Sequence, residues 1–178
     1  PLFDEDTKKA TDMAEEAVNG FGAVYKEKSL SMLRAKLGLF GVRAEDESLI
    51  ADLLDWMQRQ DADYTNTFLD LTKKAPPKGE PYAGETFKEW YTRWQARLAK
   101  NMEPLKSSLS LMRANNPAVI PRNHKVEQVL EAATNGDLQP LKDLLAALQE
   151  PYKNRSDLKP YQSPPKPEAK VCQTFCGT

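Results

Sequence analysis

The sequence predicts an all-α protein, and three observations lead to that prediction. Apolar residues recur at three- and four-residue steps through most of the 178 residues. The 13 prolines and 8 glycines fall mostly between these periodic stretches. No stretch reads convincingly as a β-strand. We therefore expect a bundle-like domain of about six to eight helices over residues 1–152, followed by an extended, proline-rich tail over residues 153–178.

The first periodic stretch, from about residue 4 to residue 39, predicts one long helix or two joined helices. Gly20 and Gly22 lie inside it, and each costs up to about 1 kcal/mol relative to alanine, so we expect a kink or close packing there. Gly38 is placed to end the helix as its C-terminal cap. The apolar positions of this stretch are Met13, Ala17, Phe21, Val24, Met32, Leu33 and Leu37.

Four further helices are expected between residues 46 and 115. Asp46 can cap one with a broad apolar face, and the next is expected to start at Asp61. Three prolines and two glycines make residues 75–84 a loop. The helix over residues 85–100 should contribute most to the core, because its rings share one face. That face holds Phe87, Trp90, Tyr91, Trp94 and Leu98. The last helix starts near Pro104.

Residues 116–152 predict a sharp turn and a helical hairpin. Asn116-Pro117 breaks the preceding helix, because a residue before proline disfavours the α conformation. Asn135-Gly136 ends the first helix of the hairpin, Asp137 is a good N-cap for the second, and Pro151 stops it. Helices joined this tightly should pack antiparallel. Their apolar stripes are Val126, Val129, Leu130 and Ala133, and then Leu141, Leu144, Leu145 and Leu148.

Composition excludes several classes of function. A net charge of −1 gives no global electrostatic case for binding nucleic acid or an anionic membrane. No apolar run approaches the roughly 20 residues that span a bilayer, and the acidic start lacks the apolar region of a signal peptide. A start at Pro1 rather than Met indicates a trimmed or excised piece. Two cysteines make no disulfide framework, so a reducing, cytoplasmic setting is expected.

Few side chains suggest catalysis. There is no glycine-rich phosphate loop and no kinase or hydrolase motif. A zinc site would need carboxylates beside one histidine and two cysteines. His124 can act as a general base in principle, but a capping or packing role is favoured because no nucleophile lies nearby in sequence. The acidic clusters fit solvated faces: Asp4-Glu5-Asp6, Glu15-Glu16 and Glu45-Asp46-Glu47.

The aromatic stripe and the two cysteines each allow two interpretations. Trp90, Tyr91 and Trp94 lie near Lys88, Arg93 and Arg97 and could imitate a base-stacking platform, but a core stripe with a charged outer face is favoured. Cys172 and Cys176 are four residues apart, and on a helical turn their Cα atoms would be about 6 Å apart, within disulfide range. Two incidental, reduced thiols are the other interpretation.

Four passages resemble the selenoprotein O family, whose bacterial group is called YdiU. Residues Asn116-Pro117 and Arg122-Asn123 match its N-P-x-x-x-x-R-N segment. Residues 32–40 (MLRAKLGLF) and 63–68 (DYTNTF) are similar to two further family segments. The ending Phe175-Cys176-Gly177-Thr178 looks like the bacterial terminus, where Cys176 falls at the position of selenocysteine in vertebrate members.

This resemblance implies a larger enzyme with a protein-kinase-like fold, a pseudokinase. Its members use ATP with Mg²⁺ or Mn²⁺ to transfer AMP to Ser, Thr or Tyr hydroxyls of proteins, and some bacterial members use UTP similarly. The nucleotide and metal residues belong to the preceding kinase-like part, so no catalytic residue, cofactor or metal is expected on this segment. The family also implies that Cys176 is a redox residue; Cys172 adds the option of a local bridge.

Two hypotheses about function follow. In the first, the chain is the C-terminal helical part of such an adenylyltransferase, packs against its kinase-like region and carries the tail thiol. Its partners would be that region and protein substrates, with no nucleic acid and no membrane. In the second, the chain is a free-standing helical module that binds a partner protein through the aromatic stripe or the hairpin.

Overall fold

The computed structural model describes residues 3–73 and 75–169. Every regular element among these residues is helical, which confirms the predicted all-α class. The longer helices are α1 (Thr7–Lys36), α2 (Asp46–Arg59), α3 (Tyr64–Leu71), α4 (Glu85–Leu98), α5 (Leu105–Asn115), α6 (Asn123–Thr134) and α7 (Gln139–Leu148). Three short turns follow: η1 (Ser156–Leu158), α8 (Lys159–Gln162) and η2 (Pro167–Ala169). None of the described helices combines the length and apolarity needed to cross a bilayer.

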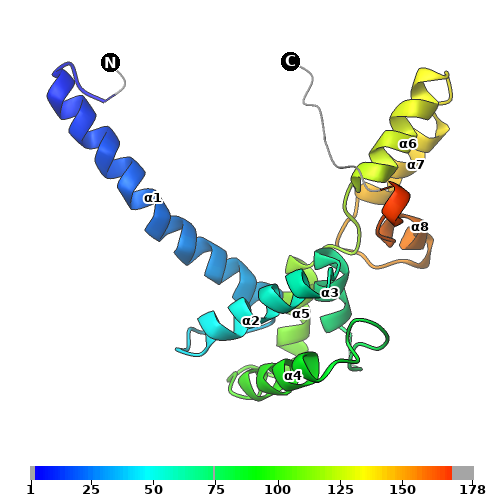
Figure 1. Ribbon diagram of the computed structural model, residues 1–178, viewed down its shortest axis with the longest axis horizontal. Coiled ribbons are helices and arrows are strands. Elements are labelled where there is room, and N and C mark those ends of the chain that lie inside the picture. Colours follow the sequence, from blue (N-terminus) through cyan, green and yellow to red (C-terminus); the bar gives the residue numbers. More distant parts are fainter. Residues whose placement is uncertain (1–2, 74, 170–178) are drawn as a thin grey trace.

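The helices form a compact base with two projecting arms (Figure 1). Helices α2 to α5 and the C-terminal end of α1 make the base, where α1 packs on α2 and α5, and α2 packs on α4. The rest of α1 is one arm. The other arm is the α6–α7 hairpin, whose helices pack on each other as the sequence predicted. The short turns after residue 155 lie at the foot of the hairpin.

The aromatic stripe of α4 belongs to the core of the base. Phe87, Trp90 and Trp94 are each only 3% exposed, so they offer no base-stacking surface. The indole Nε1 of Trp90 donates to the carbonyl of Leu49 at 2.8 Å, and that of Trp94 donates to the carbonyl of Leu37 at 3.0 Å. These bonds satisfy the buried indoles and tie α4 to both α2 and the end of α1.

A buried ion pair corrects the prediction that Arg97 and Asp46 face solvent. Arg97 is 2% exposed and Asp46 is 1% exposed. Arg97 Nε lies 2.6 Å from Asp46 Oδ1, and Nη2 lies 3.2 Å from Oδ2. The remaining guanidinium donors reach Asn101 Oδ1 and the carbonyl of Phe40. Asp46 also accepts from the backbone N–H of Arg43, so the carboxylate holds the loop before α2 rather than capping the helix itself; Glu45 is the N-cap residue.

Helix α1 is continuous, and the expected kink or close packing at Gly20 and Gly22 is wrong. Nothing outside the helix lies within 4 Å of a Cβ built at either glycine. Both glycines lie on the projecting arm, where no other described helix packs against them. Gly38 does end the helix as predicted, at φ +70°, and a Cβ there would come within 2.9 Å of Met112 Cγ. Glycine is therefore required at this turn for both conformation and space.

Residues 153–169 were predicted to be extended, and the structure differs from that prediction at residues 156–162 and 167–169. They form short helical turns, and Leu158 is fully buried against Ala118, Val119 and Ala147. The side-chain amide of Gln162 donates to the carbonyl of Ala118 at 3.0 Å. Tyr161 packs against the same cluster, and Asn66 Nδ2 donates to the carbonyl of Gln162 at 3.0 Å, so several contacts hold this proline-rich segment on the domain. Residues 170–178, with Cys172 and Cys176, lie outside the described residues.

Two helix starts also differ from the prediction. The helix expected to start at Asp61 begins at Tyr64, and its N-cap residue Asp63 accepts from the N–H of Asn66 at 2.8 Å. Asp61 has a positive φ of 48° and precedes the helix. Leu138 rather than Asp137 is the N-cap residue of α7, although Asp137 Oδ1 still accepts from the N–H of Gln139.

Replacing Arg97 by methionine should strongly destabilise the domain. The change leaves the Asp46 carboxylate buried without its partner, which typically lowers the free energy of unfolding by about 3–5 kcal/mol. Arg93→Met is the matched control, because Arg93 lies one turn earlier on α4 and pairs with Asp52 at the surface; it should change stability by about 1 kcal/mol or less. Urea unfolding of both variants measures the difference, and equal effects would contradict a structural role for the buried pair.

Candidate functional site at the 116–123 turn

The turn between α5 and α6 joins the base to the hairpin arm (Figure 1). It carries all four residues singled out by their motif: Asn116, Pro117, Arg122 and Asn123. The backbone N–H groups of Ala118 and Val119 both point to the carbonyl of Pro151, at 2.6 and 3.3 Å. These two bonds tie the turn to Pro151, which lies just beyond the end of α7, the second helix of the hairpin.

Asn116 connects this turn to the end of α1. It is 2% exposed, and its Nδ2 donates to the main-chain carbonyl of Lys36 at 2.8 Å. Its Oδ1 accepts from Lys36 Nζ at 3.1 Å, and the same ammonium group donates to the carbonyl of Asn115. Lys36 Nζ also lies over the ring of Phe68, 4.9 Å from its centroid. Burial lowers the pKa of Lys36, and these contacts compensate the partly buried charge.

Arg122 connects the turn to α3 through a two-bond ion pair. Its Nη1 lies 2.7 Å from Asp63 Oδ2, and its Nη2 lies 3.0 Å from Asp63 Oδ1. Arg122 is 8% exposed, and its Nε is buried without a hydrogen-bond partner in the described structure. Burial acts to raise the pKa of Asp63, but the bonds from Arg122 and from the Asn66 N–H outweigh it and hold the pKa below its ordinary value.

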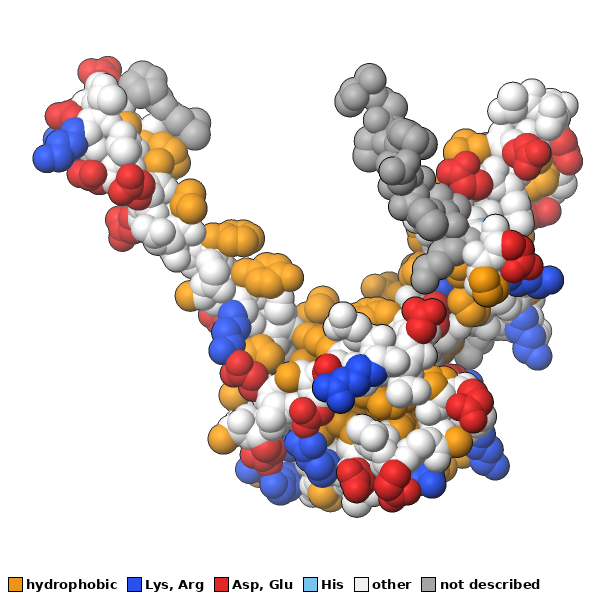
Figure 2. Space-filling model, viewed as in Figure 1, with side chains coloured by type: hydrophobic (Ala, Val, Ile, Leu, Met, Phe, Trp, Pro, Cys, Tyr) orange, Lys and Arg blue, Asp and Glu red, His pale blue; other side chains and the backbone are white. Residues whose placement is uncertain are grey.

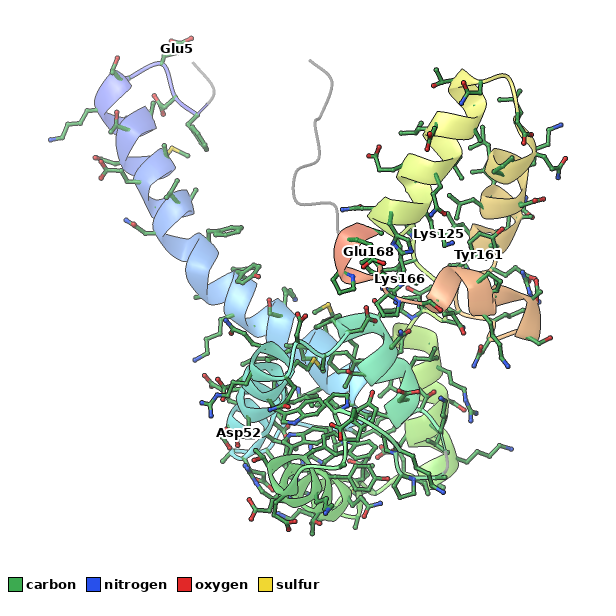
Figure 3. All side chains as sticks on the ribbon, turned by 45° about the vertical axis from the view of Figure 1, so that its right-hand side comes forward. Glu5, Asp52, Lys125, Tyr161, Lys166 and Glu168 are labelled. Carbon is green, nitrogen blue, oxygen red and sulfur yellow. The ribbon has the colours of Figure 1, made fainter. Side chains whose placement is uncertain are left out.

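The other motif residues make fewer contacts. Pro117 is half-buried, and Asn123 is the exposed first residue of α6. His124, in the first turn of α6, is half-buried. Its pKa is lowered first by burial and then by the charges of Lys125 and Arg122, so the imidazole is neutral at pH 7. The side chains around the foot of the hairpin, including Lys125 and Tyr161, are drawn in Figure 3.

An acidic groove beside Asp63 was not predicted from the sequence. It encloses about 760 Å³ and lies between α3, the 75–84 loop and the proline-rich segment. The Tyr82 hydroxyl donates to Asp70 Oδ2 at 2.8 Å there, and burial followed by the contact with Asp70 raises the pKa of Tyr82. Residues 3–73 and 75–169 hold no group of three or more His, Cys, Asp or Glu side chains that could bind a metal. No sequence signal marks this groove, because its walls come from separate segments.

The arrangement at the turn is that of a structural joint. Asn116 connects the turn to the end of α1, and Arg122 connects it to the start of α3, so both motif side chains fix the position of the turn on the base. Cys172 and Cys176, which were predicted to carry redox chemistry, lie outside the described residues.

Asp63→Asn should lower the free energy of unfolding by about 2 kcal/mol, because the charge-assisted bonds to Arg122 are lost. The folded-state pKa of Asp63 lies below its ordinary value of 3.8. Its contribution is therefore fully present above pH 3.8 and is lost as the pH falls through the lower folded-state pKa. Urea unfolding at several pH values should show the difference between the natural chain and the variant shrinking only at acidic pH. The exposed Asp52→Asn change is the control, and a pH-independent difference would contradict the ion pair.

Comparison with known proteins agrees with the resemblance read from the motifs. A family described as "Protein adenylyltransferase SelO" matches residues 7–149. Proteins named protein nucleotidyltransferase YdiU are 50% identical in Nitrosococcus oceani and 51% identical in Alcanivorax borkumensis, covering 100% and 99% of this chain. The relative from Bacillus cytotoxicus is 41% identical over 179 residues. The chain spans only 36%, 37% and 36% of the lengths of these three relatives. This chain therefore belongs to the selenoprotein O family, and it corresponds to a segment of the longer proteins of that family.

Proposed function

We propose that this chain is the C-terminal helical part of a protein nucleotidyltransferase and that it supports the catalytic part. The match to an adenylyltransferase family over residues 7–149 supports the activity, as do relatives that are named nucleotidyltransferases. The remaining length of those relatives provides room for a separate catalytic part, since this chain spans 36% of the Nitrosococcus oceani protein.

The proposed reaction of the complete protein is the transfer of AMP from ATP to a Ser, Thr or Tyr hydroxyl of a protein. The acceptor oxygen forms a bond to the α-phosphorus, the bond to the departing pyrophosphate breaks, and the hydroxyl proton passes to a base or to solvent. Mg²⁺ or Mn²⁺ would neutralise the phosphate charge. Following the family resemblance, we place ATP and the metal in the catalytic part, and we assign no catalytic residue to this segment.

The apolar face of α1 is the observation that carries the supporting role. Between residues 10 and 28 the helix projects from the base, yet Phe21 is 66% exposed, Val24 is 55% exposed and Tyr25 is 62% exposed. At about 100° per residue these positions, with Met13 and Ala17, share one side of the helix. Figure 2 shows hydrophobic side chains along the side of α1 that faces the hairpin arm.

This face is not the face by which α1 packs on the base. Phe21 and Leu30 are nine residues apart and therefore point to opposite sides of the helix. Leu30, Leu33 and Leu37 pack into the core of the base, while the side that carries Phe21 meets no described element. A continuous apolar stripe of this kind is typical of a surface that another body covers. We assign that body to the catalytic part of the same protein rather than to the partner of a free-standing module.

A labelled-AMP transfer assay tests this proposal. The complete protein should transfer AMP from ATP to a protein acceptor in the presence of Mg²⁺ or Mn²⁺, and this chain alone should not. Phe21→Glu in the complete protein should lower the transfer rate at least about tenfold by placing a charge in the covered face. Met102→Glu is the control, since Met102 is 97% exposed and outside the stripe. Transfer by the isolated chain, or an unaffected Phe21→Glu protein, would contradict the proposed division of roles.

We also propose that Cys176 is a redox-active thiol. Forming a disulfide removes two electrons and two protons from a pair of thiols, and a mild oxidant such as diamide accepts them. In the complete protein we expect Cys176 to pair, either with Cys172 or with a cysteine of the catalytic part. Peptide mapping by mass spectrometry after oxidation identifies the partner, and Cys172→Ser separates the two pairings. Recovery of Cys176 as a free thiol under conditions that oxidise the other cysteines would end this proposal.

A further inference from the structure

Helices α4 and α5 leave an apolar groove between them at the base. Helix α4 packs mainly on α2, and α5 packs mainly on α1, and the groove lies between α4 and α5. The groove encloses about 590 Å³. Its floor contains Trp94 and Leu109, which are 3% and 9% exposed, and Leu71 from the end of α3 closes one side. Leu105 stands at its edge and is 62% exposed.

The charged residues around this groove are all cations. Lys73, Lys106 and Arg113 line it, and no carboxylate does. Lys73 pairs with Asp70, whereas Lys106 and Arg113 have no ion-pair partner within the described part of the chain. On α5 these two are seven residues apart, about 10 Å along the axis, with Leu109 between them. The groove therefore combines an apolar floor with two uncompensated positive charges.

We infer that the α4–α5 groove is a docking site for an acidic amphipathic helix of a protein acceptor. This inference rests on the proposed transfer of AMP to proteins and names the kind of acceptor surface that this segment recruits. A helix laid in the groove would bury its apolar stripe against the exposed Leu105 and the half-buried Tyr91 and Leu98 that line it. Carboxylates two turns apart on that helix would meet Lys106 and Arg113. An anion with a single head group would meet only one of the two charges, so a helical protein segment fits better than a small amphipathic acid.

The groove is separate from the apolar face of α1. It lies between α4 and α5 at the base, whereas the hydrophobic side chains of the α1 arm face the hairpin (Figures 1 and 2). Covering the α1 face with the catalytic part does not by itself require covering the groove. The same protein can therefore hold its own catalytic part on one surface and an acceptor on the other.

Fluorescence anisotropy on the complete protein tests the docking site. The probe is a labelled synthetic helix of about four turns, with leucines on one face and glutamates on both flanks. It should bind in the absence of nucleotide, and its affinity should fall as the salt concentration rises. A matched probe with glutamine in place of glutamate should bind about tenfold more weakly or worse.

Two variants complete the design. The double change Lys106→Glu and Arg113→Glu should weaken binding of the glutamate probe about tenfold or more, while Lys9→Glu with Lys142→Glu, on exposed cations elsewhere, should not. Leu105→Ser should also weaken binding without unfolding the domain, because Leu105 is already exposed. Circular dichroism checks that each variant is folded.

Several outcomes would overturn the inference. The first is equal binding of the glutamate and glutamine probes, and the second is binding of the glutamate probe by the Lys106/Arg113 variant as tight as by the natural protein. The third is no binding by the complete protein, even if this chain alone binds, because the rest of the protein would then cover the groove. Self-association of the complete protein that the same double change abolishes would assign the groove to a second copy. Because no nucleotide is present, probe binding by a protein that fails to transfer AMP would refute the proposed function and leave the docking site standing.

Discussion

The side-chain amide of Asn116 hydrogen-bonds both the main-chain carbonyl and the ammonium group of Lys36, and so joins the end of α1 to the turn that leads into the hairpin. This contact fixes the start of the hairpin arm against the end of the α1 arm. Asn116 is almost fully buried, so neither of its bonds competes freely with water, and losing one would leave a buried polar group without a partner. Arg122, six residues later, adds a second fixed point on the N-cap of α3.

The direction in which α1 leaves the base determines where its exposed apolar face lies. A long helix that buries Leu33 and Leu37 in the base and carries Phe21 on its opposite face must project its apolar stripe beyond the base. Most helical stability in proteins comes from packing an apolar face, which is why we propose that a second body covers this arm. We propose that the joint presents α1 to the catalytic part in a fixed orientation, which would link this turn to the activity of the whole protein.

Local rules predicted most of the helices but few of the contacts between them. Proline and glycine located the breaks near residues 38, 117 and 136, because these residues act on their own backbone. The burial of Arg97 was not predictable, since its partner Asp46 is 51 residues away. Apolar residues at three- and four-residue steps predicted a single apolar face for α1. The spacing did not distinguish the face that carries Phe21 from the face that carries Leu33. Asn116 and Arg122 were identified only through family motifs, as nothing local indicates Lys36 or Asp63 as their partners. Leu158, a lone apolar residue among prolines, gave no periodic signal for a docked tail.

Hydrogen–deuterium exchange along α1 distinguishes an arm covered by a catalytic part from an arm that remains free in the complete protein. If the catalytic part covers the apolar face as proposed, amides between residues 10 and 28 should exchange quickly in this chain alone and much more slowly in the complete protein. Amides in the core of the base, such as those around Leu53 and Trp94, should be protected in both and serve as the internal reference. Equal exchange of α1 in the two proteins would contradict the account and favour a free-standing helical module.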